Sequence, residues 1–167
     1  AEIKSALAKE RHKFVTETDT EVIAHLIEKH LPASEGLADA VKKSVTELDG
    51  VYAITVASTR FPDAVVAAKL GPPLIVAFGE GENYVASDIL AVLPYTRDVA
   101  FLEDGDVAEV RRDGIRVWNR KGVLTERPRT HVTWDTVAIE KGGFKHFMLK
   151  EIHEQPAAIR ETLTGRI

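Results

Sequence analysis

The spacing of the apolar residues changes once along this chain, near Gly50, and that change limits the folds open to it. Before Gly50 the apolar residues recur every three or four positions, which is the period of one helix face. From Val51 to Asn119 they come in short runs or alternate with polar residues, which is typical of β-strands. A helical pattern returns near the carboxyl end. The order predicts an α+β fold that layers helices on sheets.

The first fifty residues predict three helices. A short opening helix carries Ile3 and Leu7, and a brief extended run at 12–16 follows it. A second helix reaches about His30, with Thr18 or Asp19 as its expected N-cap. A third helix has its apolar residues at 37, 41, 45 and 48 and stops at Gly50.

The middle of the chain predicts short strands separated by turns. We expect strands at residues 51–57, 64–69, 74–78, 84–86, 99–102, 106–111 and 115–119. We expect turns at 61–63, 71–73 and 79–83, and a meander of hairpins over the last three strands. Residues 125–133 contain Pro128 and are predicted to form a loop.

Two further helices complete the prediction. Ser87 or Asp88 is expected to cap a short helix through Leu93. A long final helix follows Gly142-Gly143, and Pro156 is expected to bend or interrupt it.

Length and charge exclude several classes of function. The 167 residues fit one domain, and no apolar stretch approaches the roughly 20 residues of a membrane helix. The formal net charge is -4 with no basic stripe, so nucleic acid is not an expected partner. Residues 1–11 do not resemble a secretory signal, and we expect a cytoplasmic protein.

The residue types that carry most catalytic chemistry form no recognisable set. The chain contains no cysteine, which excludes disulfides, thiolate metal sites and a cysteine nucleophile within it. Ser58 and Ser87 lack a nucleophile elbow. Histidines five and seven residues apart on two helices do not give the i, i+4 spacing of a zinc helix, so no metal site is predicted. No cofactor is predicted either, since the glycines at 79–83 accompany two acids and indicate a charged turn.

Asp19 is the one candidate binding residue. Its carboxylate precedes a helix and is flanked by Thr18 and Thr20, where it could accept hydrogen bonds from a ligand ammonium. Ordinary N-capping, worth about 1 kcal/mol, explains the same position. The residues alone leave both interpretations open, with capping favoured.

Several segments resemble the amino-terminal glutaminase domain of the glutamine-fructose-6-phosphate amidotransferases, also called glucosamine-6-phosphate synthases. Glu17-Thr18-Asp19-Thr20-Glu21 and Ala86-Ser87-Asp88 are two of them, and the run from Phe147 to Pro156 is the most specific. The likeness covers the whole chain in the family's order, at 12–26, 79–83, 86–88, 93–97, 102–106, 146–156 and 163–166.

The resemblance implies an N-terminal nucleophile hydrolase fold of the class II glutamine amidotransferase type, with stacked antiparallel sheets between helix layers, here incomplete. It implies a parent enzyme of hexosamine biosynthesis that hydrolyses glutamine and transfers ammonia to fructose 6-phosphate, giving glucosamine 6-phosphate and glutamate. Residues 1–155 would be the last two-thirds of the glutaminase domain. Residues 156–167 would begin a linker toward an isomerase (SIS) domain of the same chain.

The resemblance also assigns residue roles. The family's nucleophile is an amino-terminal cysteine, assisted by an Asn-Gly pair and an arginine-containing loop, and none of these has a counterpart here. No catalytic residue is therefore expected in this chain, which we predict to be inactive alone. Asp19 matches the aspartate that binds the α-ammonium of glutamine. Ser87 and Asp88 match without a role beyond capping and packing, and His153 and Glu154 resemble domain-junction residues.

The sequence is compatible with three interpretations of the whole chain. The start at Ala1, without a methionine or a helix cap, favours a fragment, whose missing strands would expose sheet edges and promote homo-oligomers. A naturally cysteine-free binding or regulatory relative is the main alternative. A glutaminase with another acceptor is the third, and the run from Lys150 to Pro156 argues against it.

Overall fold

The computed structural model describes residues 2–133 and 143–163, which fall into two units. The first unit is Ala1–Val132 and the second is Thr133–Ile167. Among the described residues, no helix combines the length and apolar character needed to cross a membrane. Predictions that fall on Ala1, Gly142 or residues 164–167 lie outside the described residues.

The predicted helices of the first unit are present with small differences in length. They are α1 (Glu2–Lys9), α2 (Glu21–His30) and α3 (Leu37–Val45), with the 3-10 turn η1 (Leu31–Ala33) between the last two. Residues 12–16 form no strand. The apolar stripe of α3 was predicted to reach Leu48, but the helix ends at Val45. The Thr46 hydroxyl donates to the Lys43 carbonyl and satisfies one acceptor at that end.

One antiparallel sheet has the strand order β1-β2-β6-β7-β8. Its strands are β1 (Tyr52–Ser58), β2 (Phe61–Leu70), β6 (Val107–Arg111), β7 (Gly114–Trp118) and β8 (Leu124–Thr125). The turn predicted at 61–63 is wrong, because β2 already begins at Phe61. Pro62 is tolerated there because the β1–β2 register shifts between Ala57 and Ser58, and pairing with β6 starts only at Ala64.

The second antiparallel sheet has the order β4-β3-β5-β9. Its strands are β3 (Ile75–Phe78), β4 (Asn83–Ala86), β5 (Asp98–Phe101) and β9 (Arg129–His131). Two predictions are corrected here. Residues 125–133 are not a loop throughout, because β9 pairs with β5. The predicted meander is also wrong, because β5 and β6 lie in different sheets and the turn at Glu103–Gly105 carries the chain from one to the other.

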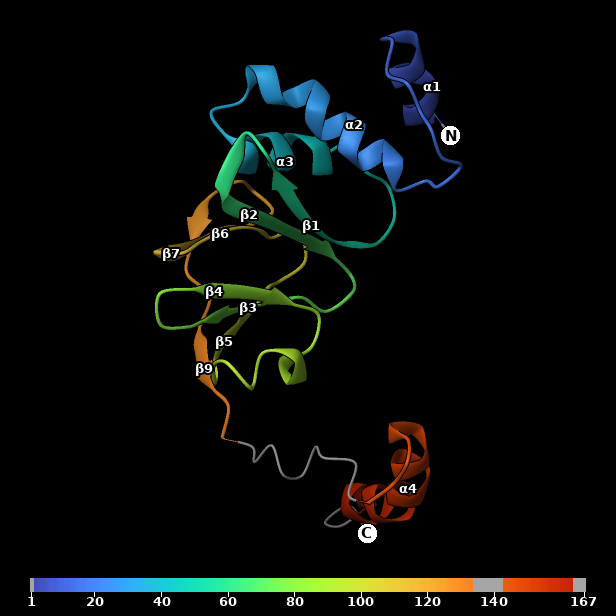
Figure 1. Ribbon diagram of the computed structural model, residues 1–167, viewed down its shortest axis with the longest axis vertical. Coiled ribbons are helices and arrows are strands. Elements are labelled where there is room, and N and C mark those ends of the chain that lie inside the picture. Colours follow the sequence, from blue (N-terminus) through green and yellow to red (C-terminus); the bar gives the residue numbers. More distant parts are fainter. Residues whose placement is uncertain (1, 134–142, 164–167) are drawn as a thin grey trace. The chain divides into compact units, whose positions relative to one another are not determined.

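Two apolar cores hold these layers together. Helices α2 and α3 lie side by side over one face of the first sheet (Figure 1), where Val41 packs with Val66, Ala68 and Val107. The opposite face of that sheet packs on the second sheet. The residues of this second core are Ala67, Leu74, Val76, Ala100, Leu102, Ala108, Val110 and Val117. The predicted α+β architecture with stacked antiparallel sheets is confirmed.

The second unit contains the helix α4 (Phe147–Leu163). The helix runs through Pro156, so the predicted interruption does not occur. Ile152, four residues earlier, is exposed, and water can satisfy the carbonyl that Pro156 leaves without a donor. The proposed boundary between residues 155 and 156 falls inside this helix.

Candidate functional site

The loop between α1 and α2 carries the predicted binding residue and is held by Glu21. The Glu21 carboxylate accepts hydrogen bonds from the backbone N–H groups of Val15 and Thr16 at 2.8 and 2.9 Å, and from the Thr16 hydroxyl. The hydroxyl bond from Thr16 is the largest cause, followed by the Val15 N–H, and together they lower the pKa of Glu21 to about 2. The loop is thereby fastened to the first turn of α2.

The predicted capping by Thr18 or Asp19 is wrong. Thr20 occupies the N-cap position and makes no side-chain capping bond. Asp19 instead contributes its backbone carbonyl, which accepts from Val22 N–H at 3.3 Å. The capping alternative for the Asp19 side chain is therefore removed.

The Asp19 carboxylate is available to a ligand. The residue is exposed, and within the described part of the chain its carboxylate has no hydrogen bond or ion pair. Its position before α2 places the negative charge near the helix N-terminus, where backbone N–H groups give a favourable field. Such a carboxylate can accept charge-assisted hydrogen bonds from an ammonium group.

The other residues that matched the family have structural contacts. Asp88 accepts from Leu90 N–H at 2.8 Å and caps the 3-10 turn η2 (Ile89–Ala91), so the cap is Asp88 and not Ser87. The predicted helix through Leu93 is this shorter turn. In the second unit, His153 stacks on Phe144 with ring centroids 5.2 Å apart. Glu154 lies 3.4 Å from the Lys150 ammonium, and the junction role of both residues stays a prediction.

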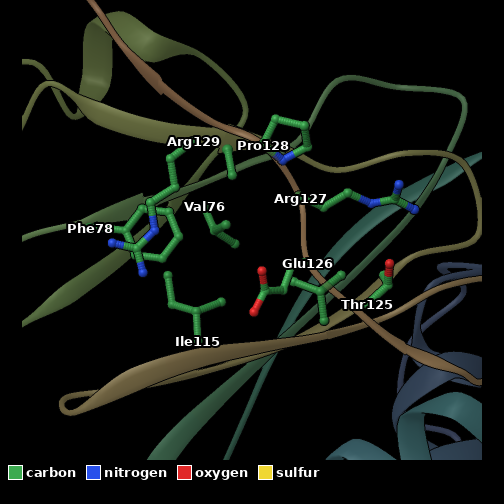
Figure 2. Close-up of a pocket in the computed structure, with 10 residues that line it drawn as sticks. Val76, Phe78, Ile115, Thr125, Glu126, Arg127, Pro128 and Arg129 are labelled. Carbon is green, nitrogen blue, oxygen red and sulfur yellow. The ribbon is translucent and has the colours of Figure 1, made fainter.

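A cavity of about 750 Å³ lies between the two sheets (Figure 2). Val76 and Phe78 line it from the second sheet, and Ile115 and Val117 from the first. Its remaining lining residues are Ala100 and 125–129.

The charged residues of this cavity are largely committed to structural contacts. The Arg127 side chain extends away from the cavity in Figure 2 and binds Asp106. The Arg129 guanidinium lies 3.8 Å from the centre of the Phe78 ring, a cation–π contact. Glu126 is the acidic member of the lining, and Thr125 beside it carries the hydroxyl group. In the part of the chain that the structure describes, no histidine or cysteine lines the cavity with them. We therefore assign no catalysis to this cavity.

The structure also brings together three residues that the sequence did not group. His12, from the loop after α1, meets His25 and Glu28 of α2. The prediction paired histidines by spacing within one helix and so could not include His12. No local signal marks a contact made across thirteen positions of sequence.

Comparison with known proteins gives the class of this fold. Residues 1–94 match the family described as glutamine amidotransferase domain, which is more than half of the chain. The chain therefore belongs to the glutamine amidotransferase domain family. A solved structure of glutamine phosphoribosylpyrophosphate amidotransferase from B. subtilis, complexed with ADP and GMP, superposes with a TM-score of 0.59 and is 25% identical. The match covers 74% of this chain and 27% of that one. The predicted class II glutamine amidotransferase fold is confirmed.

Comparison with individual relatives of known name is more specific than the match to the domain family. The chain is 49% identical to the glutamine–fructose-6-phosphate aminotransferase (isomerizing) of Thermotoga maritima over 99% of its own length, and 49% identical to that of Aquifex aeolicus over 98%. The protein of the same name from Clostridium tetani is 46% identical over 99% of this chain. The chain spans 27% of the length of each of these relatives. The predicted resemblance is confirmed.

Proposed function

We propose that this chain forms part of the glutaminase portion of an enzyme that takes ammonia from glutamine to fructose 6-phosphate, giving glucosamine 6-phosphate and glutamate. The names of the relatives that match 98–99% of the chain support this reaction. Residues 1–155 would belong to the glutaminase domain. Residues 156–167 would begin the linker to an isomerase domain of the same chain.

Asp19 is proposed to bind the α-ammonium of glutamine. The observation that carries this role is an exposed carboxylate without a protein partner among the described residues, on a loop that Glu21 fastens to α2. A rigid loop lowers the entropy cost of binding, because the carboxylate is already placed before the ligand arrives.

The nucleophile is proposed to come from outside these 167 residues. The chain contains no cysteine, and although the Thr16 hydroxyl donates to Glu21, the pKa of that carboxyl group is lowered to about 2, which makes it a weak base. The chain alone is therefore expected not to hydrolyse glutamine. We further propose a cytoplasmic homo-oligomer that interacts with neither nucleic acid nor membrane.

The test of the Asp19 role uses the complete gene product with Asp19→Asn. A lost charge-assisted hydrogen bond costs roughly 1.5–3 kcal/mol, so KM for glutamine should rise roughly 10- to 150-fold while kcat falls less. Glu17→Gln is the matched control, since Glu17 is an exposed acid in the same loop and should leave KM unchanged.

One result would contradict the proposed role of Asp19 in glutamine binding. If Asp19→Asn and Glu17→Gln give the same KM as the parent enzyme, Asp19 does not contact glutamine. In that case the α-ammonium of glutamine is bound by another group.

A further inference from the structure

Two imidazoles and a carboxylate converge on one point beside α2. His12 Nδ1 and His25 Nδ1 lie 3.2 Å apart. Glu28 Oε2 lies 3.5 Å from His12 Nδ1 and 3.6 Å from His25 Nδ1. The three atoms therefore form a nearly equilateral triangle. We propose that His12, His25 and Glu28 bind a divalent transition-metal ion of the zinc class.

The size of the triangle fits such an ion. Zinc binds histidine nitrogen and carboxylate oxygen at about 2.0–2.2 Å, usually with tetrahedral geometry. In a tetrahedron with ligands at about 2.05 Å, neighbouring ligand atoms are about 3.3–3.4 Å apart. The three distances here lie within a few tenths of an ångström of that edge, so an ion can enter with small side-chain adjustments.

Hydrogen bonding alone satisfies this cluster poorly. A neutral pair of imidazoles can share one proton between the two facing Nδ1 atoms, which makes a single hydrogen bond. The carboxylate oxygen is then too distant from both nitrogens for a good hydrogen bond. A cation accepts both nitrogen lone pairs and the carboxylate charge at once.

The surroundings of the cluster are those of a metal site. The His12 and His25 side chains are 15% and 18% exposed, and the Phe14 ring packs edge-on against His25 with centroids 4.5 Å apart. The second ring nitrogen of His25 faces a Glu21 oxygen at 3.7 Å, the kind of outer carboxylate that orients metal-binding histidines. Glu28 is 70% exposed, which leaves the outer side open for water as a fourth ligand.

The donor set also selects the ion. Imidazole and carboxylate ligands suit zinc, cobalt, nickel and copper, whereas magnesium and calcium prefer all-oxygen sites. A bound ion would join the loop after α1 to α2. This proposal does not depend on the role of Asp19 in glutamine binding.

The test is a titration of the metal-stripped 167-residue chain with Co²⁺ and Zn²⁺. Calorimetry should give one equivalent with a micromolar Kd, and Co²⁺ should show the visible absorption of a tetrahedral site. Glu28→Gln lies on the surface and preserves the helix, and it should weaken binding by at least about tenfold, as should His25→Ala. His131→Ala is the control, because His131 pairs with Asp98 in the second sheet. Its replacement should leave the metal affinity unchanged.

Circular dichroism of each variant separates loss of the site from loss of the fold. The proposal is overturned if binding is absent below millimolar metal, or if folded Glu28→Gln binds as tightly as the parent chain. It is also overturned if the bound equivalent is removed instead by His131→Ala, or by a double variant of His146→Ala, before α4, and His153→Ala, within α4.

Discussion

Replacing Asp106 with asparagine is expected to destabilise the first unit more than most single substitutions. Asp106 is 1% exposed, and its two carboxylate oxygens accept hydrogen bonds from Arg127 at 2.7 and 2.8 Å. One of these oxygens also accepts from Glu103 N–H at 2.8 Å. Asp106 lies where the chain has just crossed between the sheets, and Arg127 precedes β9, so the pair fixes both connections.

The size of this destabilisation depends on which contacts Arg127 keeps after the substitution. Hydrogen bonds to a charged group are each worth about 1.5–3 kcal/mol, and removing one partner of a buried ion pair costs about 3–5 kcal/mol. Arg127 keeps Glu103 at 2.7 Å, but that carboxylate is 69% exposed and compensates only in part. We expect Asp106→Asn to lower the free energy of unfolding by about 3 kcal/mol.

Urea denaturation followed by circular dichroism measures this change. Glu126→Gln, a neighbouring surface change, should stay within about 0.5 kcal/mol of the parent chain. The double variant Asp106→Leu/Arg127→Met removes both charges and should recover most of the loss, because no buried charge is left unpaired. If Asp106→Asn costs under about 1 kcal/mol and the double variant is no more stable than Asp106→Asn, the pair does not stabilise the connection between the two sheets.

The remaining predictions concern acid stability and glutamine binding. Burial by itself would raise the pKa of Glu109, but hydrogen bonds from Arg111 and Arg116 outweigh it and hold that pKa below its usual value. The stability from this group is therefore complete above the unfolded pKa of about 4.3 and is lost as pH falls through the lower folded pKa. Urea midpoints between pH 3 and 7 should fall less steeply for Glu109→Gln, and parallel curves would contradict the assignment. Calorimetric titration of the 167-residue chain with glutamine should detect no sub-millimolar binding, because one ammonium contact supplies only a few kcal/mol before entropy costs. A sub-millimolar Kd would show that further ligand groups lie within this chain.

The helices and most strands could be predicted because their signals are local. Apolar residues at helical spacing marked α2 and α3, and glycine-containing turns marked both ends of β3 and the start of β4. The strand β9 could not be found in this way. All of its residues are exposed, Pro128 precedes it, and its pairing depends on the edge that β5 offers. Strand pairing is non-local, so the turn at Glu103–Gly105 looked like a hairpin although it joins two sheets.

The candidate site was predictable only in part. The family resemblance singled out Asp19, but capping chemistry is shared by Thr18, Asp19 and Thr20, and spacing could not show that none of their side chains caps α2. The role of Glu21 was missed because its partners, Val15 and Thr16, lie in the preceding loop. The cluster of His12 with His25 depends on the same loop conformation.

We propose that this chain serves a glutamine-dependent sugar-phosphate aminotransferase. The most direct measurement is product analysis of the complete gene product incubated with glutamine and fructose 6-phosphate. We predict equal amounts of glutamate and glucosamine 6-phosphate, formed only when both substrates are present. Absence of glutamine hydrolysis, or transfer of the nitrogen to a different acceptor, would contradict the account.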